Sequence, residues 1–329
     1  MGSGVMNSSS VAKYAGAAIA VAAVSACSGG TAAVPSSGLT TTARQAAGHR
    51  YDSVVSDMLA KSPSKYYEYI FNVYGSYAGI FDYPRSTREI DQISGIGGQG
   101  CTNVLYGYGK GIVWNVGGPD QITEFKVPKT PIKTLSVDYP FATSCAMNTS
   151  GDLAVGTYAT SAGKGGELVI FKNGSGKGKV YKTPLDQEFF DGYDNKGNLF
   201  ADGFTAYRSN YALVELPKGG KKAVIVRLPN VPSFPGSVQW DGKYVTVLDS
   251  RANLTYQYTI KGTKATLKHT ITYTGMNGCS QTWIAQGLLF CADAGNDAAE
   301  VFKYPQGGAP VATFTGDFDE PLGVTAAQK

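Results

Sequence analysis

Histidine and long apolar runs are both scarce in this sequence, and each shortage narrows the set of possible functions. Only His49 and His269 occur among the 329 residues. Imidazole is the side chain that most often moves protons near neutral pH, so histidine-based acid–base chemistry and a histidine metal site are not expected. The clearest apolar segment, residues 14–24, has eleven residues, which is too few for a helix that spans a bilayer.

Charge is scarce as well. Charged residues make up 16% of the chain, against a usual share of about 25%. The net charge of +4 is spread along the sequence without a block of Lys or Arg, so no nucleic-acid partner is expected. Glycine and tyrosine, by contrast, are abundant, with 42 and 21 residues. This composition favours β-structure with many tight turns and argues against coiled coils.

Residues 1–26 have the pattern of a secretory signal peptide. A polar start containing Lys13 is followed by the apolar segment 14–24 and then by small residues, which is the order of regions in such signals. Residues 24–27, VSAC, resemble the lipobox of bacterial lipoproteins. The resemblance implies that Cys27 becomes the N-terminus and that its thiol carries a lipid, which anchors the exported chain to a membrane. The alternative is an ordinary signal peptide with an incidental cysteine.

The segment 27–64 is expected to be the lipidated Cys27 followed by a flexible spacer, because it is rich in Ser, Thr, Ala and Gly. Within it, the apolar residues of 51–61 have helical spacing and predict a short helix. Ser28 stands where lipoproteins retained in the inner membrane of Gram-negative bacteria commonly have Asp. This difference favours the outer membrane or the cell surface.

From residue 65 onward, the chain repeats one pattern of a strand followed by a turn. Six copies align on the apolar residue before the turn: Phe81, Phe125, Phe171, Val214, Tyr258 and Phe302. Their successive spacings are 44, 46, 43, 44 and 44 residues. A period in this range with several strands per unit is typical of β-propeller blades. Residues 65–329 are therefore predicted to form one all-β domain, a six-bladed propeller.

The second to sixth units also contain an innermost strand that begins with small residues, as at Gly100 and Ser144, and a second strand often opened by glycine, as at Gly151. The first unit has no innermost strand before residue 66. Gly323 follows Cys279 by one period of 44 residues. The C-terminal segment is thus predicted to be the missing strand, which would close the ring and remove an exposed sheet edge.

Two stretches show this order of strands most clearly: residues 140–176, PFATSCAMNTSGDLAVGTYATSAGKGGELVIFKNGSG, and 277–308, NGCSQTWIAQGLLFCADAGNDAAEVFKYPQGG. They resemble units of NHL and YVTN-type β-propellers, which have six or seven blades. The resemblance covers roughly four fifths of the chain. It implies an architecture but no particular activity, because one fold supports many functions.

Four cysteines remain after Cys27, and an even number in an exported chain suggests disulfides. Cys279 and Cys291 lie on the first and second strands of one unit, where a hairpin could place them opposite each other. Cys101 and Cys145 occupy equivalent positions in neighbouring units, and their pairing depends on a close approach that the sequence does not give. A zinc site is the competing interpretation, but the sequence has no Cys-x-x-Cys pair and little histidine.

A binding role is the first functional hypothesis. Loops between units and loops between the second and third strands lie on one face of a propeller, and here they carry aromatic and arginine side chains that typically anchor a protein or glycan ligand. The candidates are Tyr139, Phe141, Phe189, Phe190, Asp191, Phe234 and Phe318 between units, and Tyr77, Tyr158, Tyr207, Arg208 and Arg251 within them. The hypothesis is a membrane-anchored, non-catalytic, monomeric binding protein without a cofactor.

A metal-dependent hydrolase is the alternative. Regucalcin-like lactonases bind a divalent ion on the propeller axis through oxygen ligands, and a similarity to them would imply a site for Ca²⁺ or another divalent cation. The innermost strands offer the candidate ligands Asn103, Asp191, Asp194, Gln239 and Gln281. Only one unit supplies carboxylates, and amides alone bind metal weakly. The repeated aspartate at the end of the second strand, at 202, 249 and 293, is expected to be a turn residue.

Overall fold

The computed structural model describes residues 65–72, 77–117, 121–137, 142–158, 166–206 and 209–329. The predicted signal peptide, Cys27, the spacer and its helix lie outside these residues. The described part belongs to one compact unit. Within it, the structure contains no helix with the length and apolar character that a membrane crossing needs.

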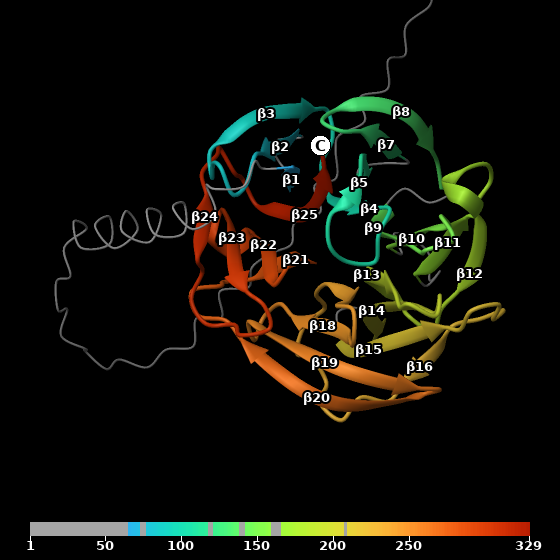
Figure 1. Cartoon of the computed structure of the whole chain (residues 1–329). Helices are drawn as coiled ribbons and strands as arrows, with labels where there is room; N and C mark the ends of the chain where they lie inside the picture. Colours follow the sequence, from blue (N-terminus) through green and yellow to red (C-terminus); the bar gives the residue numbers. More distant parts are fainter. Residues whose placement is uncertain (1–64, 73–76, 118–120, 138–141, 159–165, 207–208) are drawn as a thin grey trace, which may run out of the picture. The chain divides into compact units, whose positions relative to one another are not determined.

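Six β-sheets surround a common axis, which confirms the predicted six-bladed propeller (Figure 1). Blade 1 consists of β25 (Pro321–Gln328), β1 (Tyr66–Asn72), β2 (Tyr77–Phe81) and β3 (Glu89–Ser94), and blade 2 of β4 (Gln99–Thr102), β6 (Ile112–Val116), β7 (Ile122–Lys126) and β8 (Thr130–Leu135). Blade 3 consists of β9 (Ala142–Met147), β10 (Leu153–Thr157), β11 (Glu167–Phe171) and β12 (Lys179–Lys182).

Blades 4 to 6 follow the same order from the axis outward. Blade 4 consists of β13 (Gln187–Tyr193), β14 (Leu199–Ala206), β15 (Ser209–Leu216) and β16 (Val224–Val226), and blade 5 of β17 (Val238–Trp240), β18 (Val245–Asp249), β19 (Leu254–Lys261) and β20 (Lys264–Thr272). Blade 6 consists of β21 (Cys279–Ala285), β22 (Leu288–Asp293), β23 (Ala298–Lys303) and β24 (Ala312–Phe314). The short 3₁₀-helices Lys172–Gly174 and Ala294–Asn296 lie in turns.

The antiparallel order divides the connections between two faces of the ring. Turns that join the first strand to the second, or the third to the fourth, lie on what we call the turn face. Loops that join the second strand to the third, and the links between blades, lie on the opposite connection face. Functional side chains on these two sets of segments therefore point to opposite sides of the propeller.

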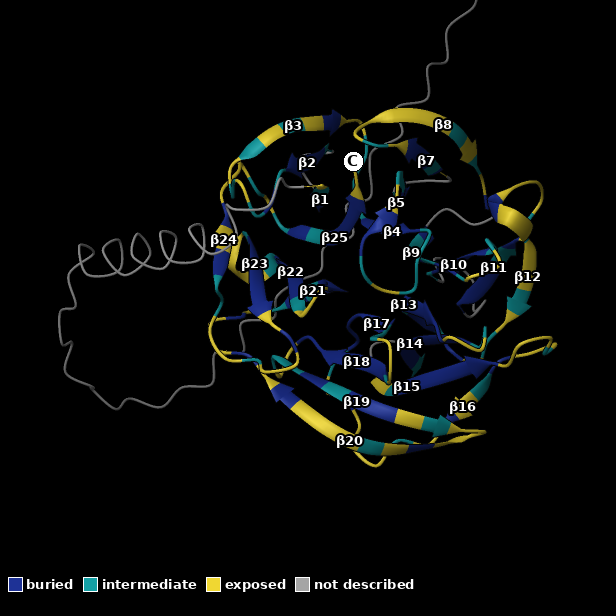
Figure 2. Ribbon diagram, viewed as in Figure 1, coloured by how far each residue is buried: buried dark blue, intermediate teal, exposed yellow. Residues whose placement is uncertain are grey.

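The repeat maps onto the third strand of every blade, because the six aligned apolar residues all lie on β2, β7, β11, β15, β19 and β23. They are buried, with exposed fractions between 0% and 4%. Figure 2 shows the same gradient for whole strands: the inner strands are buried, whereas β3, β8, β12 and β20 at the rim are largely exposed. Packing between blades thus explains why the sequence repeats an apolar residue at this position.

The C-terminal strand closes the ring as predicted. β25 pairs with β1 over seven residue pairs, from Tyr66 opposite Gln328 to Asn72 opposite Pro321. Val324 and Ala326 on β25 are fully buried. The backbone N–H of Lys329 donates to the carbonyl of Lys65 at 2.7 Å. Blade 1 is therefore assembled from both ends of the domain.

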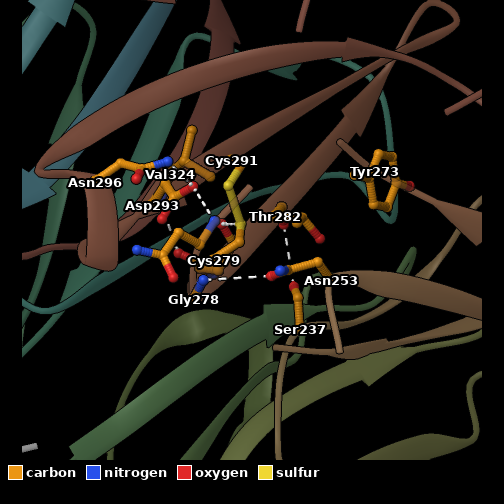
Figure 3. Close-up of a disulfide and its surroundings, with 12 residues drawn as sticks. Ser237, Asn253, Tyr273, Gly278, Cys279, Thr282, Cys291, Asp293, Asn296 and Val324 are labelled. Carbon is orange, nitrogen blue, oxygen red and sulfur yellow. Dashed lines mark hydrogen bonds between the residues drawn. A yellow bond between two sulfur atoms is a disulfide. The ribbon is translucent and has the colours of Figure 1, made fainter. Parts of the chain in front are cut away.

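Both cysteine pairs lie at disulfide distance. The Cα atoms of Cys101 and Cys145 are 5.7 Å apart, and those of Cys279 and Cys291 are 5.8 Å apart. The first bridge joins the inner strands of blades 2 and 3, and the second joins two strands within blade 6 (Figure 3). The prediction of disulfides is confirmed, and the close approach of Cys101 and Cys145, which the sequence did not give, is present. Disulfides of this kind persist in oxidising compartments outside the cytoplasm.

The repeated aspartates accept hydrogen bonds from the segments that link neighbouring blades. The Asp249 carboxylate accepts hydrogen bonds from its own turn, as predicted, and also from the backbone N–H of Ser233 at 2.6 Å. Asp293 likewise accepts the N–H of Asn277 at 2.7 Å, near the disulfide in Figure 3. Asp202 accepts the N–H of Gly236 in the link to the next blade. Their main role in the structure is to fix these links.

One segment of the fold was not expected from the repeat. Residues 103–111, between β4 and β6, extend over the axis, and we call them the axial loop. Within the loop, the two-residue strand β5 (Gly109–Lys110) pairs in parallel with β25. Figure 1 shows β5 in the middle of the ring. The loop therefore adds a fifth strand to blade 1 and covers the axis on the turn face.

Candidate functional site

An aromatic cluster occupies the connection face beside blade 4. It comprises Tyr158, Phe189, Phe204, Phe234 and Arg251, and we call it the aromatic patch. The ring centroids of Tyr158 and Phe189 are 5.6 Å apart, and Phe204 lies 5.7 Å from Phe189 and 5.5 Å from Phe234. All these ring pairs meet edge to face, which is a favourable geometry for aromatic side chains.

The patch combines a buried floor with a half-exposed surface. Phe204 is only 4% exposed, whereas Tyr158, Phe189 and Phe234 are partly exposed. The guanidinium carbon of the exposed Arg251 lies 4.9 Å from the centroid of the Phe234 ring. Because this cation–π contact orients a charged group over apolar rings, the patch offers both apolar area and a positive charge to a ligand.

Five different segments supply these side chains, with Tyr158 following β10 and Phe204 lying on β14. Phe189 comes from the beginning of β13, Phe234 from the link between blades 4 and 5, and Arg251 from the loop after β18. Their convergence agrees with the sequence analysis, which placed all three on one face. Tyr139, Phe141, Tyr207 and Arg208, which were predicted for the same face, lie outside the described residues.

Four predicted residues lie elsewhere. Phe190 is 6% exposed and packs in the apolar core with Val238 and Val247. A register shift between Glu188 and Phe190 separates its environment from that of Phe189, so the expectation that Phe190 is an exposed anchor is corrected. Asp191 is 6% exposed and is also not a surface group.

Phe318 and Tyr77 lie at blade 1. The ring centroids of Phe318 and Phe81 are 5.8 Å apart, and the Tyr77 hydroxyl donates to the carbonyl of Asp317.

The axial amides that were considered as metal ligands bind backbone groups. The Gln281 side-chain oxygen accepts the N–H groups of Gly100 and Val324, and its NH₂ donates to the carbonyl of Gly100. The Gln239 amide accepts from Ile284 and donates to Leu105 in the axial loop. These bonds connect blades across the axis, so the two glutamines hold the ring together.

Asn103 and Asp194, two further candidate ligands, form hydrogen bonds with backbone groups of nearby turns. Asn103 both accepts from and donates to the backbone of Lys110, which closes the axial loop. Asp194 accepts the N–H groups of Lys196 and Asn198. Among the described residues, no group of three or more His, Cys, Asp or Glu side chains is arranged to hold a metal ion.

Asp191 is the exception among the candidate ligands. It lines an axial cavity of about 20 Å³, which is room for about one water molecule. Neither of its carboxylate oxygens makes a hydrogen bond of ordinary geometry with the described residues. Burial raises the pKa of Asp191 well above its usual value, and the nearby Glu188 raises it further. A carboxyl group that keeps its proton is a poor ligand for a cation.

Glu188 and Asp202 complete a buried acidic cluster in blade 4. Burial raises the pKa of Glu188 to about 8, although its carboxylate accepts from the hydroxyls of Thr143 and Ser144 at 2.7 and 3.0 Å. Burial also raises the pKa of Asp202 well above its usual value. Three buried carboxyl groups beside one another favour the protonated forms, because the charged forms would lack solvation and repel each other.

Neither a protein-family model nor a curated protein sequence matches this chain. Solved structures do match it. A chain in the crystal structure of a nidogen/laminin complex has a TM-score of 0.61 and 11% sequence identity, and the match covers 80% of this chain and 98% of that chain. A functionally unknown protein from Desulfotomaculum acetoxidans has a TM-score of 0.56 and 10% identity, with coverages of 80% and 99%. At these identities the likeness shows the propeller fold, and the NHL-type resemblance stays a prediction.

Proposed function

We propose that this protein is an exported binding module, anchored to the outer membrane or cell surface through Cys27, which recognises a protein partner with the connection face of its propeller. The observation that supports this function best is the aromatic patch. Interface anchors are enriched in aromatic and arginine side chains that cluster over a packed floor, and the patch has that composition.

The other structural features agree with this proposal. The two disulfides suit an oxidising environment outside the cytoplasm. The matched nidogen/laminin structure is a complex between proteins, which makes a protein a more natural first partner than a glycan for this face. A rigid ring with a preformed patch would also bind without a large entropic cost, because its anchor side chains are already positioned.

Replacing Arg251 with Glu is expected to weaken partner binding at least tenfold without unfolding the protein. The change removes an exposed guanidinium from the ring of Phe234 and reverses the charge in the patch, and loss of one interface anchor typically costs more than about 1.4 kcal/mol. The measurement is capture of the partner from the extracytoplasmic fraction, followed by titration of the purified pair.

The matched control is Arg227→Glu, which makes the same charge change at an exposed position after the outer strand of blade 4. Both variants should keep the wild-type melting temperature. Arg227 lies on the same face but outside the aromatic patch, so if Arg251→Glu binds the partner as tightly as Arg227→Glu does, the aromatic patch is not the binding surface.

A metal-dependent hydrolase remains the second candidate, and Asp191 is the observation that favours it. A buried carboxyl group that lines an axial cavity could bind a cation, provided that the cation displaces its proton. Against it, the neighbouring amides are already hydrogen-bonded to backbone. Binding therefore accounts for more of the geometry than catalysis does.

A further inference from the structure

A second concave site lies on the turn face, opposite the aromatic patch. It is a groove between blades 3 and 4 with a volume of about 340 Å³, which is within the range of ligand pockets in proteins. Turns from both blades form its walls, including Lys172 and Lys179 from blade 3 and Lys196 and Lys218 from blade 4. We call it the lysine groove.

The groove has a marked excess of positive charge. Its lining contains those four lysines and a single carboxylate, Asp152. Asp152 lies 3.7 Å from the Lys172 ammonium, a long contact for an ion pair. Within the described part of the chain, Lys179, Lys196 and Lys218 have no carboxylate within 4.0 Å. Like charges gathered in one concavity repel each other, and a bound anion would relieve this repulsion.

The backbone beneath the lysines is held by hydrogen bonds. The N–H of Lys196 donates to Asp194, and the N–H of Lys218 donates to the side-chain oxygen of Asn198. On the opposite wall, the N–H of Asn173, next to Lys172, donates to Asp152. These bonds hold the backbone of the turns in place, so the lysine side chains start from fixed points on both walls of the groove.

The rest of the lining indicates what kind of anion would fit. Tyr181 lies in the groove with the Lys179 ammonium 4.7 Å from its ring centroid, and Tyr193 lines the same space. Ser150 and Asn195 add neutral hydrogen-bonding groups. Ile170, Leu199 and Leu216 also line the groove, but none of the large hydrophobic side chains that are strongly exposed in the described residues does, so the lining has no protruding apolar side chain for insertion into a lipid surface.

We propose that the lysine groove binds an acidic oligosaccharide, one that carries carboxylate or sulfate groups on several sugar units. Lysine ammonium groups are separate point charges without the planar fork of arginine, so they suit anionic groups distributed along a chain. The tyrosine rings and neutral polar groups would contact the sugar rings between these charges. This site is independent of the proposed partner-binding face.

The test is calorimetric titration of the full chain with trigalacturonic acid and with a trisulfated heparin disaccharide, beside the neutral trisaccharide maltotriose. We expect saturable 1:1 binding of at least one acidic sugar, none of maltotriose, and a several-fold loss of affinity when salt is raised from 50 to about 300 mM, because screening shortens the range of the lysine charges. The double variant Lys179→Ala/Lys218→Ala should bind at least tenfold more weakly at an unchanged melting temperature.

The control is Lys264→Ala/Lys268→Ala, which removes the same charge from the exposed rim strand of blade 5 and should leave affinity unchanged. The proposal is overturned if neither acidic sugar binds, or if both double variants bind as the wild type does. It is also overturned if inorganic sulfate binds as tightly as the sugars, or if only vesicles containing phosphatidylglycerol bind in a manner that depends on Lys179 and Lys218.

Discussion

Deletion of the last ten residues, 320–329, is expected to abolish cooperative unfolding of the propeller. The deletion removes β25, which pairs with β1 along its whole length. It also removes Val324 and Ala326 from a core shared by blades 1 and 6, and the Val324 N–H from Gln281. The remaining ring would have unpaired strand edges at β1 and β5, and such edges promote aggregation.

The measurement is urea unfolding followed by circular dichroism and tryptophan fluorescence. The control deletes Lys329 alone, which removes one backbone hydrogen bond and the 2.7 Å contact with Asp82. The Lys329–Asp82 pair is partly buried, and the Lys329 ammonium also lies 4.6 Å from the centroid of the Tyr67 ring. The change should therefore lower the free energy of unfolding by about 1–3 kcal/mol and leave the transition cooperative. A peptide of residues 317–329 added to the truncated protein should restore part of the transition. A truncated chain that unfolds at the wild-type midpoint would refute the closure.

The stability of the propeller is expected to decrease between about pH 4.5 and pH 8, and Glu188→Gln should remove the share of that decrease that Glu188 contributes, whereas Asp191 and Asp202 keep theirs. Burial raises the pKa of Glu188 to about 8 in the folded protein, from about 4.3 in an unfolded chain. The folded state thus keeps a proton that the unfolded state releases. Raising the pH through this window favours unfolding by up to about 1.4 kcal/mol per pH unit for each such proton.

Glutamine resembles the protonated form of Glu188, and the hydroxyls of Thr143 and Ser144 can donate to it or accept from it. We therefore expect the variant to be more stable than the wild type at pH 8 and similar to it at pH 5. Unfolding free energies measured at four pH values test this difference. Asp317→Asn, at an exposed carboxylate, is the control and should follow the wild-type profile. Parallel profiles for Glu188→Gln and the wild type would contradict the buried acidic cluster.

The architecture could be predicted from the sequence because each blade must bury the same apolar position. The spacing of Phe125, Phe171 and Phe302 therefore identified third strands. The position of Gly323, one repeat of 44 residues after Cys279, identified the closing strand. The Cys279–Cys291 disulfide was expected from a hairpin, whereas the spacing of Cys101 and Cys145 indicated equivalent positions without establishing their approach. These features depend on local strand order, which a repeat preserves.

Features that interrupt the repeat could not be predicted in the same way. The axial loop is a blade 2 insertion, and its only sequence signal is the glycine- and tyrosine-rich segment 104–111, which does not reveal the pairing of β5 with β25. The burial of Phe190 depends on a bulge beside Glu188. The lysine groove combines turns of two blades whose side chains meet only in three dimensions.

Cation binding at Asp191 would distinguish an axial metalloenzyme from the proposed binding module. The most direct measurement is calorimetric titration of the protein with Ca²⁺, Mg²⁺ and Zn²⁺ at pH 7, with the variant Asp191→Ala alongside. Because Asp191 is buried with a raised pKa and the nearby amides bind backbone groups, we predict no stoichiometric binding of any of the three ions. Binding of one ion per chain that is lost in Asp191→Ala would contradict the account and establish an axial metal site.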